Sequence, residues 1–243
     1  PRLYLWLART YQQLRQGAES NLYLQALIEE FPLSYYASVA PQLANLGAHK
    51  PWQSVFGNLG VLGQDLGKSG GFDLKRLRES PTAGPKLARA EILTYAKISA
   101  FANIALDDLE TELGRSVNYE DDTATYVYLS RLYFAAQNTF ACIRITTQLS
   151  DTIPGFWSKW PNQLSVYFPR PLLNYFRRES ERTGLAIPTL LAIARQESSF
   201  RPAVKSEAGA IGIMQLMPAT ASKFAGAAGV DGGPRRAGAL RIR

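Results

Sequence analysis

Apolar residues recur at helical spacing along most of this chain, and short stretches with glycine or proline interrupt them. Residues 3–46 have the pattern of three helices separated by two turns, with breaks at Gly17 and Pro32. Apolar positions at i, i+3, i+4 and i+7 are typical of amphipathic helices. The pattern therefore predicts an all-α protein.

The pattern of the first helix returns later in the chain. Residues 125–137 repeat residues 3–15 in register. Four side chains recur at matching positions, with Tyr4, Leu7, Arg9 and Tyr11 corresponding to Tyr126, Leu129, Arg131 and Tyr133. A weaker middle copy, in which Leu93 anticipates Leu129 by 36 residues, lies near the period of roughly 34 residues of tetratricopeptide-like helical pairs.

Helical pairs of this kind bury their apolar faces by stacking on their neighbours. We therefore predict a helical-repeat, tetratricopeptide-like solenoid over residues 1–153. The alternative is a set of generic amphipathic helices that share leucine spacing by chance. Aromatic and proline residues crowd residues 154–170, which we interpret as the join to a second domain.

The helix that follows Pro188 carries the candidate chemistry. Glu197 lies four residues after Ile193 and three after Ala194, so we expect its side chain on the apolar stripe of this helix. Burial disfavours the charged form of a carboxyl group, and a carboxyl that keeps its proton can act as a general acid. The alternative is a structural ion pair with an arginine such as Arg195 or Arg201.

A glycine-containing segment follows this helix. Gly209 and Gly212 allow tight turns, and Gln215 then lies between apolar side chains, with Met214 before it and Met217 close behind. A primary amide in such a place needs hydrogen-bond partners. A ligand with hydroxyl and acetamido groups could supply them. The alternative is an internal bond from Gln215 to the backbone, with both methionines filling a core.

The stretches ARQESSF (residues 194–200) and KSEAGAIGIMQLMPATA (205–221) closely resemble the signature of the soluble lytic transglycosylases, which share a goose-lysozyme-like catalytic domain. The Glu-Ser helix end, the Ser-x-x-Gly-Ala turn and the Gly-x-Met-Gln segment all occur in order. FPLSYYA (31–37) and YFPRPLLNYF (167–176) also resemble segments of this family. The resemblance implies that residues 171–226 form the N-terminal part of a lysozyme-like α-helical catalytic domain.

The resemblance also implies roles for individual residues. Glu197 would be the single catalytic acid and base, Ser206, Gln215 and Met217 would line the sugar cleft, and Met214 would pack behind or beside it. The reaction would cleave the β-1,4 bond between N-acetylmuramic acid and N-acetylglucosamine and close a 1,6-anhydro ring. Two alternatives are a lysozyme-like hydrolase and a non-catalytic helical-repeat fragment that binds glycan or protein.

Composition narrows the choice of partners only in part. The net charge of +7 and the pI near 9.5 fit an anionic partner. No basic stripe interleaved with aromatic residues points to nucleic acid, and no apolar run is long enough to span a bilayer. One cysteine, Cys142, and one histidine, His49, give little support for a disulfide or a zinc site. We therefore expect no metal and no cofactor.

The family resemblance implies peptidoglycan glycan strands as the substrate, and proteins of cell-wall synthesis as partners of the helical scaffold. It places the protein in the cell envelope, in the periplasm or at the outer surface, although the chain shown has no signal peptide. After Phe224 the family pattern continues with further helices, whereas residues 227–243 are rich in Gly, Ala and Arg. We expect a truncated catalytic domain and an irregular, non-native tail over residues 227–243.

Overall fold

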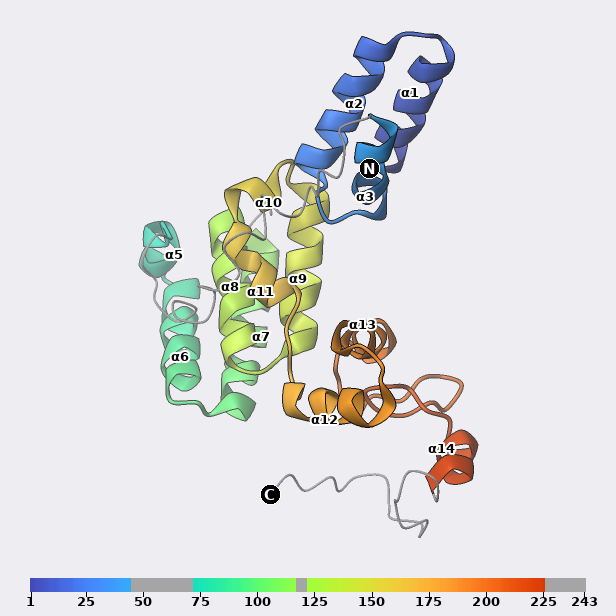
Figure 1. The fold of residues 1–243 in the computed structure, drawn as a ribbon. Coiled ribbons are helices and arrows are strands. Elements are labelled where there is room, and N and C mark those ends of the chain that lie inside the picture. The colour runs from blue at the N-terminus through green and yellow to red at the C-terminus, as the bar shows by residue number, and fades with distance from the viewer. Residues whose placement is uncertain (45–71, 117–121, 226–243) are drawn as a thin grey trace. The chain divides into compact units, whose positions relative to one another are not determined.

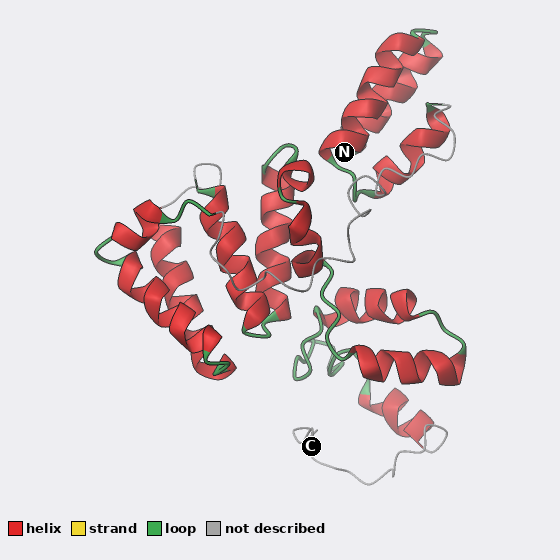
Figure 2. Cartoon of the chain, turned by 60° about the vertical axis from the view of Figure 1, so that its left-hand side comes forward, coloured by secondary structure: helices red, strands yellow, loops and turns green. Residues whose placement is uncertain are grey.

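A computed structural model describes residues 1–44, 72–116 and 122–225, which form helices joined by turns and loops (Figures 1 and 2). Within these ranges the only β-structure consists of isolated bridges. The prediction of an all-α fold is confirmed. His49 and the predicted tail, residues 227–243, lie outside the described residues.

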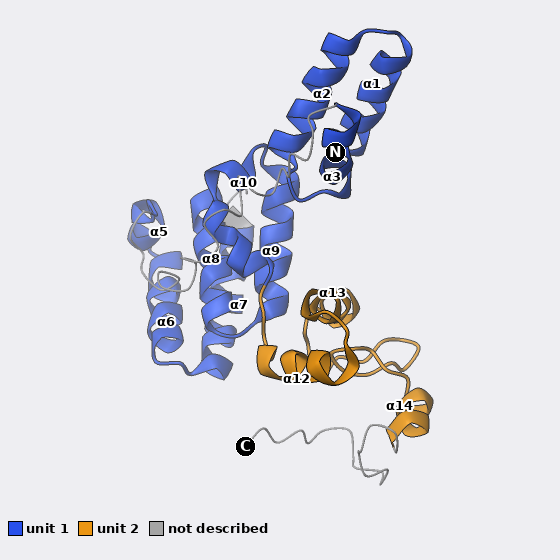
Figure 3. Ribbon diagram, in the orientation of Figure 1, with its two compact units in different colours: residues 1–168 blue, residues 169–243 orange. Residues whose placement is uncertain are grey.

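The chain divides into two compact units, Pro1–Phe168 and a second one that begins at Pro169 (Figure 3). Most of the first unit consists of helical hairpins, whose two helices contact each other. The hairpins are α1 (Arg2–Gln13) with α2 (Gly17–Glu30), α6 (Ala83–Tyr95) with α7 (Ser99–Ser116), and α8 (Thr123–Ala135) with α9 (Thr139–Thr152). Two further helices pack against these hairpins: α3 (Tyr35–Leu43) contacts α1 and α2, and α5 (Lys75–Glu79) contacts α6.

The turns of the three hairpins have the same backbone geometry. The second residue after the first helix is left-handed in each: Arg15 at φ 59°, Lys97 at φ 58° and Gln137 at φ 62°. The next N–H then donates to the carbonyl five residues earlier, from Gln16 to Tyr11 (2.9 Å), Ile98 to Leu93 (3.0 Å) and Asn138 to Tyr133 (2.9 Å). This closure satisfies carbonyl groups at the helix end that would otherwise lack partners. The three hairpins thus share one turn geometry.

The turns also fix how the middle copy aligns with the last. Lys97 and Gln137 are 40 residues apart, so Leu93 corresponds to Tyr133, and the predicted match of Leu93 with Leu129 is wrong. Burial agrees with the new alignment, since Ala102, Ala105, Leu106 and Leu109 are buried like Cys142, Ile145, Thr146 and Leu149. The predicted offset of 36 residues differs by four, close to one helical turn. Leucine spacing alone could not separate the two.

Tyrosines of α8 form polar contacts in the core of the first unit. Tyr128 Oη donates to Glu91 at 2.6 Å, and Glu91 also accepts two hydrogen bonds from the Arg78 guanidinium. Tyr133 Oη lies 2.7 Å from Asp107 and 3.0 Å from Glu110. Burial, followed by these carboxylate contacts, raises the pKa of both tyrosines far above the ordinary value. Both hydroxyls therefore act as neutral donors.

Three short helices follow α9: α10 (Phe156–Lys159), the 3-10 helix η2 (Pro161–Gln163) and α11 (Leu164–Tyr167). Phe156 and Trp157 are buried, and Gln163 is 0% exposed. The Gln163 amide donates from Nε2 to Ser130 Oγ and accepts at Oε1 from Arg131 Nε, both at 2.7 Å. Residues 154–168 of the predicted join therefore pack as part of the first unit.

Cys142 is the sole cysteine and is buried in α9, where its Sγ lies 3.6 Å from the Val166 carbonyl oxygen. Among the described residues, no helix combines the length and the apolar character needed to cross a bilayer. In the same residues no cluster of three His, Cys, Asp or Glu side chains could bind a metal ion.

Candidate functional site

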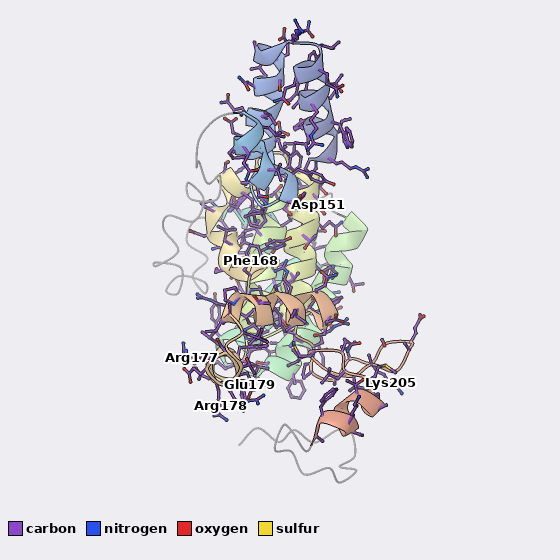
Figure 4. The ribbon with its side chains drawn as sticks, turned by 45° about the vertical axis from the view of Figure 1, so that its right-hand side comes forward. Asp151, Phe168, Arg177, Arg178, Glu179 and Lys205 are labelled. Carbon is purple, nitrogen blue, oxygen red and sulfur yellow. The ribbon has the colours of Figure 1, made fainter. Side chains whose placement is uncertain are left out.

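The second unit begins with two helices in contact, α12 (Leu173–Thr183) and α13 (Ile187–Ser198). Gly184 ends α12 in the left-handed region at φ 73°, and its N–H donates to Ser180 O at 2.8 Å. Pro188 then lies in the first turn of α13, where its missing N–H costs nothing. The side chains of α12 are exposed or half-buried, as Arg177, Arg178 and Glu179 illustrate (Figure 4).

Glu197 lies on α13 next to the buried face and not within it. The buried residues are Leu190, Ala194 and Ser198, spaced by four. Ile193 is 42% exposed, and Glu197 is exposed beside it. The prediction that Glu197 is buried is wrong, because one residue along a helix is a step of about 100° and the buried stripe is narrow. The part of the chain that the structure describes holds no ion pair of Glu197.

The chain reverses direction directly after α13. Ser199 and Phe200 are both left-handed, at φ 50° and 64°, and Phe200 is buried. Ser198, which is 2% exposed, donates from Oγ to the Ile213 carbonyl oxygen at 2.8 Å and also lies 3.2 Å from Ala194 O. The residue after Glu197 is thereby joined to the residue before Met214.

Ser198 was not among the predicted site residues. A small hydroxyl residue at the last buried position of a helix was the available signal in the sequence. Such a residue can reach a backbone carbonyl without an energetic cost for packing a large side chain.

A compact loop connects α13 to α14 (Pro218–Ala225). Ile211 pairs with Leu216 through two backbone hydrogen bonds, 3.0 and 3.1 Å long, and forms a bridge with Lys205, which Figure 4 labels on this loop. Ser206 Oγ accepts a hydrogen bond from Ala210 N at 3.0 Å, and Gly209 between them has φ 91°. The predicted cleft residue Ser206 therefore stabilises a turn of this loop.

Gln215 bonds inward to the same loop. Its Nε2 donates to Gly212 O at 2.8 Å and to Val204 O at 3.2 Å, which is the internal bonding that the sequence left open. Met214 is half-buried, whereas Met217 is 42% exposed. The structure thus brings Gln215 and both methionines into one segment, and Ser198 joins that segment to the end of α13. An exposed carboxyl group beside exposed apolar side chains can exchange a proton with a bound ligand.

Comparison with known proteins identifies the class of this second unit. Residues 174–233 match the family model of the transglycosylase SLT domain. The match covers Glu197 and the whole loop up to α14, so this part of the second unit is similar to transglycosylase SLT domains.

Longer alignments extend into the first unit. The chain is 28% identical over 146 residues to the soluble lytic murein transglycosylase of Escherichia coli K12 and 30% identical over 141 residues to that of Salmonella typhimurium. The crystal structure of the 70 kDa soluble lytic transglycosylase from Escherichia coli aligns with 96% of this chain at a TM-score of 0.55 and 24% identity, which shows a shared fold. The chain is thus similar in sequence to soluble lytic murein transglycosylases.

The chain spans only part of these relatives. Each of the two sequence alignments covers 58% of this chain and 19% of the relative. The structural alignment covers 32% of the solved chain.

Proposed function

We propose that this protein is a peptidoglycan lytic transglycosylase in which Glu197 is the general acid and base. It cleaves the β-1,4 bond between N-acetylmuramic acid and N-acetylglucosamine and forms a 1,6-anhydro product. Its location is the cell envelope, in the periplasm or at the outer surface. The SLT domain match over residues 174–233 and the murein transglycosylases among its relatives support this proposal.

The hydrogen bond between Ser198 Oγ and Ile213 O carries the proposal. At 2.8 Å it holds the end of α13, and with it Glu197, next to the segment that contains Met214, Gln215 and Met217. The residue after Glu197 is thus joined to a segment with an exposed methionine, Met217. Apolar contact with the face of a sugar ring is one interaction that a glycan needs from such a segment.

The chemistry needs one carboxyl group that works twice. Glu197 in its acid form donates a proton to the glycosidic oxygen while the bond from that oxygen to C1 of the muramyl residue breaks. The resulting carboxylate takes the proton from the muramyl C6 hydroxyl, whose oxygen bonds to C1 and closes the anhydro ring. No water is consumed, and the carboxyl group regains its proton.

The test compares the parent chain with Glu197→Gln on insoluble peptidoglycan. We expect the parent to release anhydro-muropeptides, identified by mass spectrometry, and the variant to lose at least about a hundredfold in rate, since acid–base catalysis contributes 10²–10⁴-fold. Both should sediment equally with the polymer. Glu181→Gln on α12 is the matched control, because Glu181 is equally exposed and should leave the rate unchanged.

The same assay separates the two alternatives. Products with reducing ends in place of anhydro ends would show a hydrolase, in which an acid such as Glu207 activates water. Sedimentation without any cleavage would show a binding fragment and overturn the catalytic proposal. We also propose that the helical hairpins of the first unit bind proteins of cell-wall synthesis, which a pulldown with the first unit's surface variants would test.

A further inference from the structure

We propose that Gln215 is a positioning residue: its amide group closes the loop between α13 and α14 and thereby sets the place of Met217 relative to Glu197. The sequence resemblance implies a different role, in which the amide faces the sugar. The inference rests on the proposed function for its consequence in catalysis, and its test does not require turnover.

The two carbonyl groups that accept hydrogen bonds from the amide belong to Val204 and Gly212 of this loop. Val204 O accepts from Gly212 N at 2.9 Å and from Gln215 Nε2 at 3.2 Å. Gly212 O accepts from Gln215 N at 3.1 Å and from the same Nε2 at 2.8 Å. One side-chain nitrogen thus bridges two carbonyl groups that the backbone has already brought together. Both N–H donors of the amide are used by these bonds.

The backbone of Gln215 shows why such a bridge is needed. Gln215 is left-handed at φ 47°, a conformation that costs a non-glycine residue roughly 1–2 kcal/mol. Glycine would avoid that cost, and the loop does use glycine at φ 81° in Gly212. A glutamine that takes up the same region must be held there by its own bonds. The side chain supplies two, and they offset the cost of the conformation.

The consequence concerns the neighbouring residues. Ile211 and Leu216 are paired by backbone hydrogen bonds across this closure, and Met217 follows directly. If the closure opens, the direction in which the chain leaves toward α14 is no longer fixed. Ser198 bonds to Ile213 within the same turn, so the opening also loosens the attachment to the end of α13. Gln215 therefore acts on the site through Met217 and Glu197.

The test uses hydrogen–deuterium exchange of the purified chain, measured as protection factors for the amides of Ile211, Gly212 and Leu216. In Gln215→Glu at pH 7 the carboxylate has no donor and faces two carbonyl oxygens. We expect protection to fall by at least about tenfold, in keeping with the loss of two hydrogen bonds. At pH 4 the carboxyl group gains a proton and can donate one bond, so protection should return in part.

Two further variants keep the result interpretable. Gln215→Met has similar length and no donor at any pH, so its protection should be low at both pH 7 and pH 4. Gln196→Glu places the same charge on an exposed position of α13 and should leave the loop unchanged. Protection of the α12 and α13 amides, unchanged in every variant, reports that the unit is still folded.

The exchange results test the positioning role of Gln215 without any measurement of activity. Parental protection in Gln215→Glu at pH 7, or recovery of Gln215→Met at pH 4, would overturn it. If Glu197→Gln keeps its activity while the exchange results are as expected, the proposed function fails and the positioning role of Gln215 stands. With an active parent, Gln215→Glu should regain cleavage of peptidoglycan as the pH falls toward 4, whereas Gln215→Met should not.

Discussion

Gln163 offers a sharp test of how the first unit holds its last three short helices. The side chain is fully buried, and its amide joins Ser130 and Arg131 of α8 to η2. Arg131 also lies over the Phe72 ring, with its guanidinium carbon 4.8 Å from the ring centroid. Burial lowers the pKa of Arg131 because the charged guanidinium loses hydration. The Gln163 oxygen accepts a hydrogen bond from this guanidinium and offsets part of that loss.

The magnitude for Gln163→Leu follows from these contacts. Loss of a hydrogen bond to a charged group costs about 1.5–3 kcal/mol, and loss of the neutral bond to Ser130 adds about 1 kcal/mol. Ser130 keeps its donor bond to Val127 O at 2.8 Å, so little further cost arises there. We expect the free energy of unfolding of the first unit to fall by about 2.5–4 kcal/mol.

Urea unfolding followed by tryptophan fluorescence measures this loss selectively. All four tryptophans of the chain lie in residues 1–168, so the signal reports the first unit alone. Gln163→Glu keeps the acceptor for Arg131 and should lose less than Gln163→Leu. Gln148→Leu on the exposed surface of α9 is the control and should stay within about 0.5 kcal/mol of the parent. An equally small effect of Gln163→Leu would refute the reasoning.

Two further predictions concern the first unit. Tyr133→Phe should destabilise it at pH 8. Burial raises the pKa of Tyr133 in the folded state, so the stability that this hydroxyl contributes is complete below the pKa of the unfolded chain, near 10, and declines above it. Urea unfolding should show the difference in the free energy of unfolding between parent and variant shrink by about 1.4 kcal/mol from pH 8 to pH 11, and a constant difference would contradict the cause given. Gln137→Gly should stabilise the unit by up to about 1 kcal/mol, since φ 62° suits glycine. The same glycine at the exposed helical position Gln148 should destabilise it by a similar amount, and thermal unfolding followed by fluorescence measures both.

Helical periodicity was sufficient to predict the fold class and the helices that carry the site. The first repeat, which aligns residues 3–15 with 125–137, agrees with the shared turn geometry at Arg15 and Gln137. Periodicity failed where several faces of a helix are apolar. In α1, Leu3 is 68% exposed and the C-cap residue Leu14 is 62% exposed, although both are apolar, whereas Leu5 and Ala8 are buried. Which face is covered depends on neighbouring helices and not on the helix itself.

The candidate site shows the same limit at the scale of one residue. The motif fixed the order of Glu197, Ser206 and Gln215, and the structure places them on a helix end and one loop. Burial of Glu197 could not be predicted, because the neighbours of a helix decide which residue beside the stripe is covered. The inward direction of the Gln215 amide also depends on carbonyl groups eleven and three residues away, which a side-chain pattern does not reveal.

The three hairpin turns have a consequence for how such a chain can evolve. An arginine, a lysine and a glutamine occupy one and the same left-handed position, at Arg15, Lys97 and Gln137. What the three turns share at this point is a path of the main chain, while the side chain differs. A substitution at this position therefore requires only a residue that can adopt a positive φ, so side chains of different charge and length can occupy it.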